Sequence, residues 1–301
     1  MRSLVTGGAG FVGQALRQHL ADAGDDVITT DRASGGPDIT DREAVATFIG
    51  AHDVDVIYHL AAQAHVPTSW RDPIGTFRVN AEGTQNVLDA IGESSDTRVI
   101  VVTSAEVYGA VPTDRLPISE SEPLRPVTPY ASSKVAADAV ALQAFLGRNV
   151  DVIRARAFNH IGPGQRTSFV AAGLAERIAL AERVGGSTVR VGNLSPRRDF
   201  TDVRDVVRAY RLLAQHGAAG EVYNVCSGVD RAIGDIADGL VALATSTITV
   251  ERDPDLERDV DVPVVRGDRT RIEEDTGWSP RIDLEQSLAD ILEDARRRID
   301  D

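Results

Sequence analysis

Short apolar runs alternate with helical patterns along the first half of the chain. Runs of apolar and β-branched residues predict buried strands at 3–6, 27–30, 55–60 and 99–102. A helical pattern follows the first run, and a long helix is predicted from about Pro73 to Ile91. Because strands that alternate with helices form parallel sheets, this half predicts a doubly wound α/β fold that binds ligands at the carboxyl ends of its strands.

The second half continues the α/β pattern with longer helices. A strand is predicted at 152–156, and a strand followed by a turn at 221–228. Glycine and proline mark a loop between them, at 162–164. Helices are predicted from Ser168 onward and at 203–215, 233–244, 268–276 and 284–299.

Composition places the chain among soluble globular proteins. It has 301 residues, of which 42% are hydrophobic and 26% charged. No apolar run is long enough to span a membrane and no charged-then-apolar leader precedes the first strand, so we expect a cytoplasmic protein. The single cysteine, Cys226, excludes an internal disulfide and fits a reducing compartment. A net charge of −14 argues against nucleic acid as the main partner.

A glycine-rich turn separates the first strand from the first helix. Gly7, Gly10 and Gly13 form a G-x-x-G-x-x-G spacing, with Phe11 and Val12 inside it. Glycines between a strand and a helix permit a tight turn and let the backbone approach a phosphate closely. The turn therefore predicts a dinucleotide whose pyrophosphate lies at the helix N-terminus.

Asp31 ends the second predicted strand, 18 residues after Gly13. A carboxylate there binds the adenosine ribose hydroxyls and repels a 2′-phosphate, which favours NAD. Arg32 follows directly and could attract that phosphate, so the choice between NAD and NADP stays open. Asp38 and Ile39 lie in a short loop that we expect to touch the adenine.

Two further strand ends carry candidate residues for the same crevice. Ser104 follows the fourth strand, and a turn cap is the alternative role for its hydroxyl. Small residues after the third strand leave room for a cofactor. The cofactor-binding residues predicted at these two ends are Leu60, Ala61, Ala62, Gln63 and Thr103.

Tyr130 and Lys134 are four residues apart, so they lie on one face of a helix. Lys134 is the single lysine among 32 basic residues. An ammonium beneath a phenol stabilises the phenolate and lowers its pKa, and a tuned phenol can pass a proton at neutral pH. We therefore expect this pair to be an acid/base couple.

Together these motifs resemble the extended short-chain dehydrogenase/reductase (NAD-dependent epimerase/dehydratase) family over essentially the whole chain. The resemblance also includes His59 to Ala62, Asn80 and Arg198 to Phe200. It implies that Tyr130 is the acid/base at a sugar hydroxyl or carbonyl, that Lys134 also holds the nicotinamide ribose, and that Ser104 hydrogen-bonds the same sugar oxygen. Asn80 would support Lys134, and Phe158 would contact the cofactor.

The segments 158–165, 192–194 and 221–228 resemble the GDP-6-deoxy-D-mannose reductases, and GDP-mannose 4,6-dehydratases carry a related first segment. The planar guanidinium of an arginine can donate two parallel hydrogen bonds, which suits the oxygens of a diphosphate. The resemblance implies a set of substrate-binding residues, namely Ala105, Glu106, Asn159, Phe169, Val170, Asn193, Arg198 and Arg258.

Ala105 bears on the reaction. Elimination of water needs an acid and a base beyond the tyrosine, and alanine donates no proton, so Ala105 argues against a dehydratase although Glu106 remains. The resemblance implies NAD(P)H-dependent reduction of the C4 ketone of GDP-4-keto-6-deoxy-D-mannose to GDP-D-rhamnose. A nucleotide-sugar 4-epimerase or 4,6-dehydratase with retained NAD is the alternative, and a non-catalytic dinucleotide-binding regulator is a remote one.

The resemblance also implies an architecture. We expect a Rossmann domain at 1–158 plus 199–226 and a smaller α/β C-terminal domain for the nucleotide sugar at 159–198 plus 227–301. We expect no metal, no nucleic acid and no membrane among its ligands. A homodimer is expected, with the helices near 80–92 and 130–146 as its interface.

Overall fold

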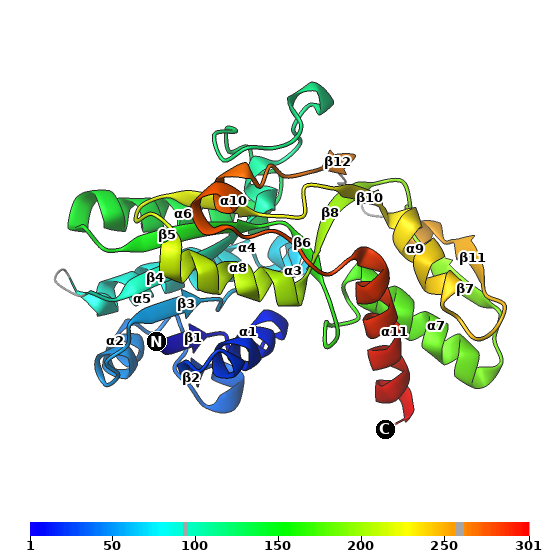
Figure 1. Cartoon of the computed structure of the whole chain (residues 1–301), viewed down its shortest axis with the longest axis horizontal. Coiled ribbons are helices and arrows are strands. Elements are labelled where there is room, and N and C mark those ends of the chain that lie inside the picture. Colours follow the sequence, from blue (N-terminus) through cyan, green and yellow to red (C-terminus); the bar gives the residue numbers. More distant parts are fainter. Residues whose placement is uncertain (93–95, 257–261, 301) are drawn as a thin grey trace.

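The computed structural model describes residues 1–92, 96–256 and 262–300, and it confirms the α/β fold. Its larger layer is a six-stranded sheet in the order β2-β1-β3-β4-β5-β9, in which every neighbouring pair is parallel. The strands are β1 (Arg2–Thr6), β2 (Asp26–Thr30), β3 (Val56–His59), β4 (Arg98–Ser104), β5 (Val152–Ala157) and β9 (Val222–Val225) (Figure 1).

Helices cover both faces of this sheet. One face packs against α1 (Phe11–Asp22), α8 (Val203–His216) and α10 (Thr270–Thr276) in a single apolar cluster. The other face packs against α2 (Arg42–Gly50), α5 (Gly83–Ile91) and α6 (Pro129–Arg148). Burial on both faces explains why the central strands β3 and β4 are nearly continuous apolar runs and do not alternate.

The long helix predicted from Pro73 to Ile91 is present but is not uniform. It consists of α4 (Pro73–Phe77), a π-helical segment (Arg78–Glu82) and α5, and α3 (Val66–Arg71) precedes it. Asn80 lies in the middle of the π-helical segment. Such segments recur at functional sites because they redirect side chains and backbone groups.

A smaller α/β layer lies beside the large sheet, on the right in Figure 1. Here β8 (Arg197–Asp202) pairs with three short strands, and two further strands form a ribbon. The short strands are β6 (Asn159–Ile161), β10 (Asp230–Ala232) and β12 (Val264–Val265), and the ribbon is β7 (Thr188–Val191) with β11 (Thr249–Arg252). The helices are α7 (Val170–Val184), α9 (Ile233–Ala242) and α11 (Leu284–Asp300), which share one apolar core.

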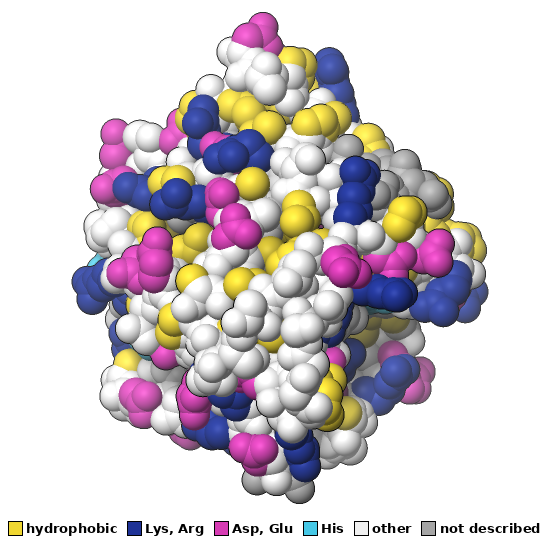
Figure 2. Space-filling view, turned by 90° about the vertical axis from the view of Figure 1, so that its right-hand side faces the viewer, with side chains coloured by type: hydrophobic (Ala, Val, Ile, Leu, Met, Phe, Trp, Pro, Cys, Tyr) yellow, Lys and Arg dark blue, Asp and Glu magenta, His cyan; other side chains and the backbone are white. Residues whose placement is uncertain are grey.

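The face that this smaller layer presents to solvent carries no broad field of one charge. Acidic and basic side chains are interspersed there among apolar ones (Figure 2). The predicted division into two domains stays a prediction. Ile272 of α10 and Trp278, both from the C-terminal part of the chain, pack in the core beneath α8 of the large sheet.

Candidate active site

The glycine turn lies between the end of β1 and the start of α1. Gly7 has a φ of 74°, and a Cβ added there would lie 2.8 Å from the amide nitrogen of Ala61. A Cβ at Gly13 would lie 2.2 Å from the carbonyl oxygen of Gly7. Side chains are therefore excluded at both positions, and the bare backbone with the α1 N-terminus fits a dinucleotide pyrophosphate. Gly10 caps α1, and Phe11 and Val12 open it.

Asp31 lies at the end of β2, beside the glycine turn. Its carboxylate accepts hydrogen bonds from the amides of Ala33, at 2.8 Å, and Ala9, at 3.3 Å. Arg32 points elsewhere, because its guanidinium pairs with Asp38 at 3.2 Å. A hydrogen bond from the backbone of Thr40 is the main cause that lowers the pKa of Asp38. The Asp38 carboxylate therefore stays charged at neutral pH, next to the neighbourhood predicted for the adenosine ribose.

The residues after β3 contact the π-helical segment. The Asn80 side chain accepts from the backbone amide of Gln63 at 2.8 Å and donates to its carbonyl at 3.1 Å. Leu60, Ala61 and Ala62 are partly buried between Gln63 and β3. Ile39, in the loop predicted to touch the adenine, packs against Gly83 at the start of α5. This contact holds the loop against α5, the helix that continues the π-helical segment.

Tyr130 and Lys134 lie in the first turns of α6. The helix begins there because Thr128 accepts a hydrogen bond from the Ala131 amide at 3.0 Å and Pro129 occupies the first helical position. Tyr130 is 8% exposed and Lys134 is 6% exposed. Lys134 donates from Nζ to the carbonyl oxygen of Val102 in β4 at 2.9 Å, and Thr103 is buried next to it.

The pKa of Tyr130 corrects one expectation. Burial, followed by the negative charge of Glu106, raises the pKa of this phenol, while Ser104 lowers it by a hydrogen bond. Burial also lowers the pKa of Lys134 to about 8. Desolvation, which disfavours the phenolate, outweighs the hydrogen bond with Ser104, so the pKa of Tyr130 lies above its usual value and not below it as expected. Tyr130 therefore holds its proton at neutral pH.

A short 3-10 turn, Ala105–Tyr108, places three predicted residues at the end of β4. The Ser104 hydroxyl caps this turn by accepting from the Glu106 amide at 3.2 Å, so the capping role exists beside its contact with Tyr130. Ala105 is buried, and Glu106 is exposed. The Glu106 carboxylate accepts from the Thr128 hydroxyl at 3.4 Å, so it also contacts the residue that caps α6.

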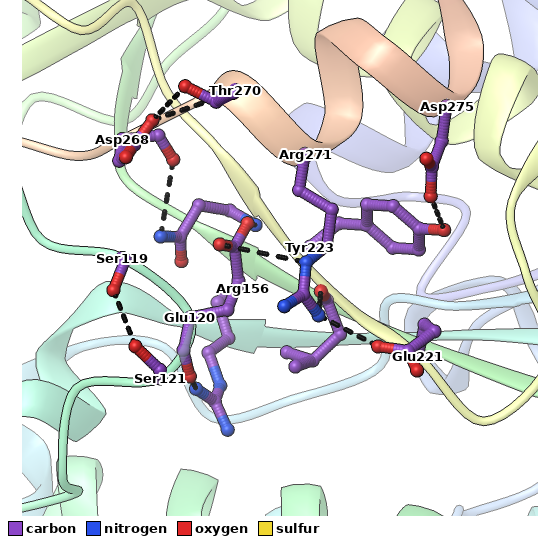
Figure 3. A network of polar contacts seen from close by, with 12 residues as sticks. Ser119, Glu120, Ser121, Arg156, Glu221, Tyr223, Asp268, Thr270, Arg271 and Asp275 are labelled. Atoms are coloured by element: carbon purple, nitrogen blue, oxygen red, sulfur yellow. Dashed lines mark hydrogen bonds and ion pairs between the residues drawn. The ribbon is translucent and has the colours of Figure 1, made fainter.

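Patterns in the sequence did not predict the buried ion network that lies behind this turn. Asp138, two turns after Tyr130 on α6, accepts from Arg154 at 2.9 Å and from two nitrogens of Arg156, at 2.9 and 3.0 Å. Arg156 also donates to the Tyr108 hydroxyl at 3.0 Å. It donates to the backbone carbonyl of Glu120 at 3.2 Å as well, and Figure 3 shows these two residues together. The signal available was an acidic residue on the apolar face of a helix, four residues after Lys134.

The network continues toward the surface through Asn224 of β9. The Tyr108 hydroxyl donates to the side-chain oxygen of Asn224 at 2.7 Å. The backbone N–H of Asn224 donates to the Glu120 carboxylate at 2.8 Å. Figure 3 shows Glu120 next to Arg271, which pairs with Glu221 at 2.7 Å. Polar contacts thus fix the turn after β4 relative to three elements, α6, β5 and β9.

Residues from the second half lie against the glycine turn. Phe158 is buried, whereas Asn159 is exposed. The His160 ring stacks on Phe11 from the glycine turn, with ring centroids 6.1 Å apart. Burial lowers the pKa of His160, so its ring is neutral, and its Nδ1 lies 3.1 Å from the Phe158 carbonyl oxygen. This contact joins the loop after β5 to the dinucleotide turn.

The remaining predicted substrate residues lie around the smaller layer. Phe169, 37% exposed, and Val170 form the N-terminus of α7. Asn193 caps its own loop by accepting from the Ser195 amide at 3.0 Å. Arg198 donates to the backbone carbonyl of Val262 at 2.6 Å. Arg258 lies outside the described residues, so its predicted contact with a diphosphate stays a prediction.

The described residues form neither a metal site nor a membrane-spanning helix. Within residues 1–92, 96–256 and 262–300, no group of three or more His, Cys, Asp or Glu side chains has the arrangement of a metal site. Over the same ranges, no helix is both long and apolar enough to cross a membrane.

Known proteins resemble the chain along almost its whole length. The family model described as GDP-mannose 4,6 dehydratase matches residues 36–291. A GDP-6-deoxy-D-mannose reductase from Pseudomonas aeruginosa is 38% identical over 99% of this chain and 98% of its own. A UDP-glucose 4-epimerase from Mycolicibacterium smegmatis is 30% identical, covering 99% of each. The structure of RMD from Pseudomonas aeruginosa complexed with NADPH superposes with a TM-score of 0.91 at 36% identity, covering 99% of this chain and 100% of that one.

Proposed function

Because the chain belongs to the NAD-dependent epimerase/dehydratase (extended short-chain dehydrogenase/reductase) family of nucleotide-sugar enzymes, we propose that it reduces the C4 ketone of GDP-4-keto-6-deoxy-D-mannose to GDP-D-rhamnose. The observation that carries this choice within the family is Ala105, a buried methyl side chain between Ser104 and Glu106. It offers no proton for the elimination that a dehydratase performs.

Tyr130 supplies the proton in this reaction. A bound reduced nicotinamide provides the hydride that reaches the C4 carbonyl carbon. The buried Tyr130 phenol, whose pKa is raised, holds its proton at neutral pH and donates it to the C4 oxygen as the alcohol forms. Ser104 hydrogen-bonds that oxygen, and the Lys134 ammonium, one turn along α6, stabilises the phenolate left behind.

The glycine cradle and the π-helical segment orient the reactants. The backbone at Gly7 and Gly13 admits the pyrophosphate, and Asn80 fixes Gln63 beside it. Holding hydride donor, ketone and proton donor together converts the encounter into a near-unimolecular step, which supplies much of the rate. Asn159, Phe169, Asn193, Arg198 and Arg258 are proposed to hold the GDP-sugar.

The direct test is oxidation of NADH or NADPH on addition of the GDP-linked 4-ketosugar. We expect loss of the reduced-nicotinamide absorbance and a GDP-6-deoxyhexose product. Tyr130→Phe should bind cofactor as the unaltered chain does but lower kcat by about 10²-fold or more, because it removes only the acidic hydroxyl. Turnover of a UDP-hexose without net cofactor oxidation would refute the reductase assignment.

A 4-epimerase is the second candidate, and one observation favours it. Relatives that include UDP-glucose 4-epimerases match with nearly full coverage. An epimerase regenerates its cofactor in every cycle and therefore retains it through purification, whereas a reductase must exchange it. Measuring the nicotinamide content of the purified protein separates the two candidates.

A further inference from the structure

A chain of buried polar side chains leads from the end of β1 into α5. The Thr6 hydroxyl lies 2.8 Å from His59 Nδ1, and His59 Nε2 lies 3.1 Å from the Thr84 hydroxyl. The three side chains belong to residues that are each 3% exposed or less. None has an evident role in the proposed chemistry. Three buried polar groups in one line require an explanation, because burying a polar group is costly unless it is hydrogen-bonded.

The chain continues from Thr84 to the catalytic helix. The Thr84 hydroxyl donates to the backbone carbonyl of Asn80 at 2.6 Å. The Asn80 side chain donates to the Ser133 hydroxyl at 2.8 Å, and Ser133 donates to the backbone carbonyl of Tyr130 at 2.7 Å. The line of hydrogen bonds therefore begins one residue before Gly7 and ends on the residue that carries the proposed acid.

The direction of every hydrogen bond along the chain follows from its two ends. A carbonyl oxygen only accepts, so the Thr84 hydroxyl donates its proton to the Asn80 carbonyl. The Thr84 oxygen must then accept a hydrogen bond from His59 Nε2–H. A neutral imidazole then has a lone pair at Nδ1, which accepts from the Thr6 hydroxyl. The Thr6 oxygen also accepts from the Ala61 amide at 3.2 Å. His59 is thus fixed as the Nε2–H tautomer.

The surroundings keep His59 in that neutral state. Burial, followed by the positive charge of Lys134, lowers the pKa of His59 to about 3. A protonated ring would have two donors, and the Thr6 hydroxyl would lose its acceptor. The neutral ring therefore has one donor and one acceptor, each matched to its neighbour.

We propose that Thr6, His59 and Thr84 are positioning residues that hold the dinucleotide turn in register with the first turn of α6. They act through Asn80 and Ser133, which link Thr84 to the backbone of Tyr130. The inference rests on the proposed function for its kinetic consequence, whereas the tautomer of His59 is a property of the chain alone.

The physical need for this link comes from the π-helical segment. A π-helical turn departs from the regular α-helical ladder, and the Thr84 hydroxyl bonds the Asn80 carbonyl at its centre. Without that bond the Asn80 side chain would shift relative to Ser133, and the Tyr130 phenol would shift relative to the cofactor. A displacement of about 1 Å at a reacting group can cost about 10²-fold in rate.

Thr84→Val tests the kinetic consequence, because valine keeps the branched shape and removes only the hydroxyl. We expect kcat for ketosugar reduction to fall by about tenfold to hundredfold. The KM for the ketosugar and the dissociation constant of NADH should change by less than about twofold, because the Thr84 hydroxyl bonds His59 and the Asn80 carbonyl. Thr84→Ser, which restores a hydroxyl, should recover most of the loss.

Thr201→Val is the matched control, because the buried Thr201 hydroxyl has no hydrogen-bond partner in the described part of the chain. It makes the same chemical change in β8, away from the chain of hydrogen bonds, and should leave kcat unchanged. If Thr84→Val were as active as Thr201→Val, or if Thr84→Ser were as impaired as Thr84→Val, the positioning role would be wrong.

Nuclear magnetic resonance of isotope-labelled histidine tests the geometry without any turnover and without a variant of Thr84. Long-range nitrogen–proton correlations distinguish the two neutral tautomers and the cation, and His59→Gln identifies the His59 signals. We expect the Nε2–H tautomer near neutral pH. An Nδ1–H tautomer or a cation would overturn the inference. If no ketosugar is reduced but His59 is the Nε2–H tautomer, the proposed function is wrong and the line of hydrogen bonds from Thr6 to Tyr130 is still supported.

Discussion

At the scale of single residues, Lys134 sets the expected pH dependence. Its pKa is lowered to about 8 because burial disfavours the ammonium. Activity that needs this charge is full below that value and is lost as the pH rises through it. We therefore expect kcat/KM, which reports groups of the free enzyme, to decline above about pH 8. A pH–rate profile for ketosugar reduction from about pH 6 to about pH 10 measures this.

Lys134→Arg is the informative variant for that profile. Its guanidinium stays charged throughout the range, but its planar fork does not match the single bond from Nζ to the Val102 carbonyl. Activity should be lower overall, and the decline near pH 8 should disappear. A profile of the unaltered chain that is flat to about pH 10 would contradict the role of the ammonium.

Asp31 is the residue on which cofactor preference should depend. Its carboxylate faces the amides of Ala9 and Ala33, and the nearby Arg32 is paired with Asp38. A 2′-phosphate would meet an uncompensated negative charge there, so we propose a preference for NADH. Asp31→Ser should raise the ratio of kcat/KM for NADPH to that for NADH by roughly tenfold or more.

Steady-state kinetics with both cofactors measure this ratio. Asp53→Ser is the control, because it removes the same charge from a fully exposed side chain of the surface pair with Arg2. The ratio should be unchanged in that variant. An Asp31→Ser ratio equal to that of the unaltered chain would show that another residue sets the preference.

At the scale of elements, Asp138 joins α6 to β5. Its carboxylate, 3% exposed, is the shared acceptor of Arg154 and Arg156. Asp138→Asn would leave two buried guanidinium groups without their counter-charge. Removing one partner of a buried ion pair costs about 3–5 kcal/mol, so we expect the free energy of unfolding in urea to fall by that amount.

Asp89→Asn gives the comparison for that loss. Asp89 also forms ion pairs with two arginines, Arg148 at 2.9 Å and Arg42 at 3.5 Å, but its side chain is 24% exposed. Because water screens this pair, the variant should lose only about 0–1 kcal/mol. An Asp138→Asn loss of similar size would mean that the buried network contributes little to the attachment of α6.

The strands of the two layers differ in how well the sequence could predict them. Apolar runs and helical periodicity predicted the six strands of the large sheet, because burial on both faces leaves a strong local signal. The short strands β6, β10, β11 and β12 have only two to four residues each. Their pairing depends on tertiary context, which local patterns do not contain.

The candidate site divides in a similar way. Tyr130 and Lys134 were found because spacing along one helix is a local property. The pairing of Asp138 with Arg156 joins residues 18 apart, and the link from Thr6 to Thr84 spans three elements. The raised pKa of Tyr130 depends on burial, which spacing alone does not reveal. Such long-range contacts were beyond the sequence patterns.

At the scale of the whole molecule, the expected homodimer stays a prediction, and the exposed surfaces of α5 and α6 decide which helix is the better candidate for its interface. Within the described chain, most of α5 is covered, since α2 and α6 flank it and Val87 and Leu88 are fully buried. The exposed residues of α6, by contrast, recur on one face, at Ser132, Ala139, Gln143 and Leu146. Leu146 is 72% exposed.

This face of α6 suits close packing against a second copy. Its small and apolar side chains let two helices approach each other, and an isologous contact would bury Leu146 of both copies. Ala139→Arg would place a long charged side chain in the middle of the contact. We therefore expect light scattering to show a dimer for the unaltered chain and a monomer for Ala139→Arg at the same concentration.

Ala219→Arg makes the same change at another exposed alanine, in the loop before β9, and should leave the dimer intact. The α6 dimer predicts a further difference between the two variants. Because the exposed face of α6 lies on the same helix as Tyr130 and Lys134, loss of the second copy should free the first turns of α6 and lower kcat as well. A monomeric unaltered chain, or a dimeric Ala139→Arg, would show that α6 faces solvent in the working enzyme and that Leu146 has no partner.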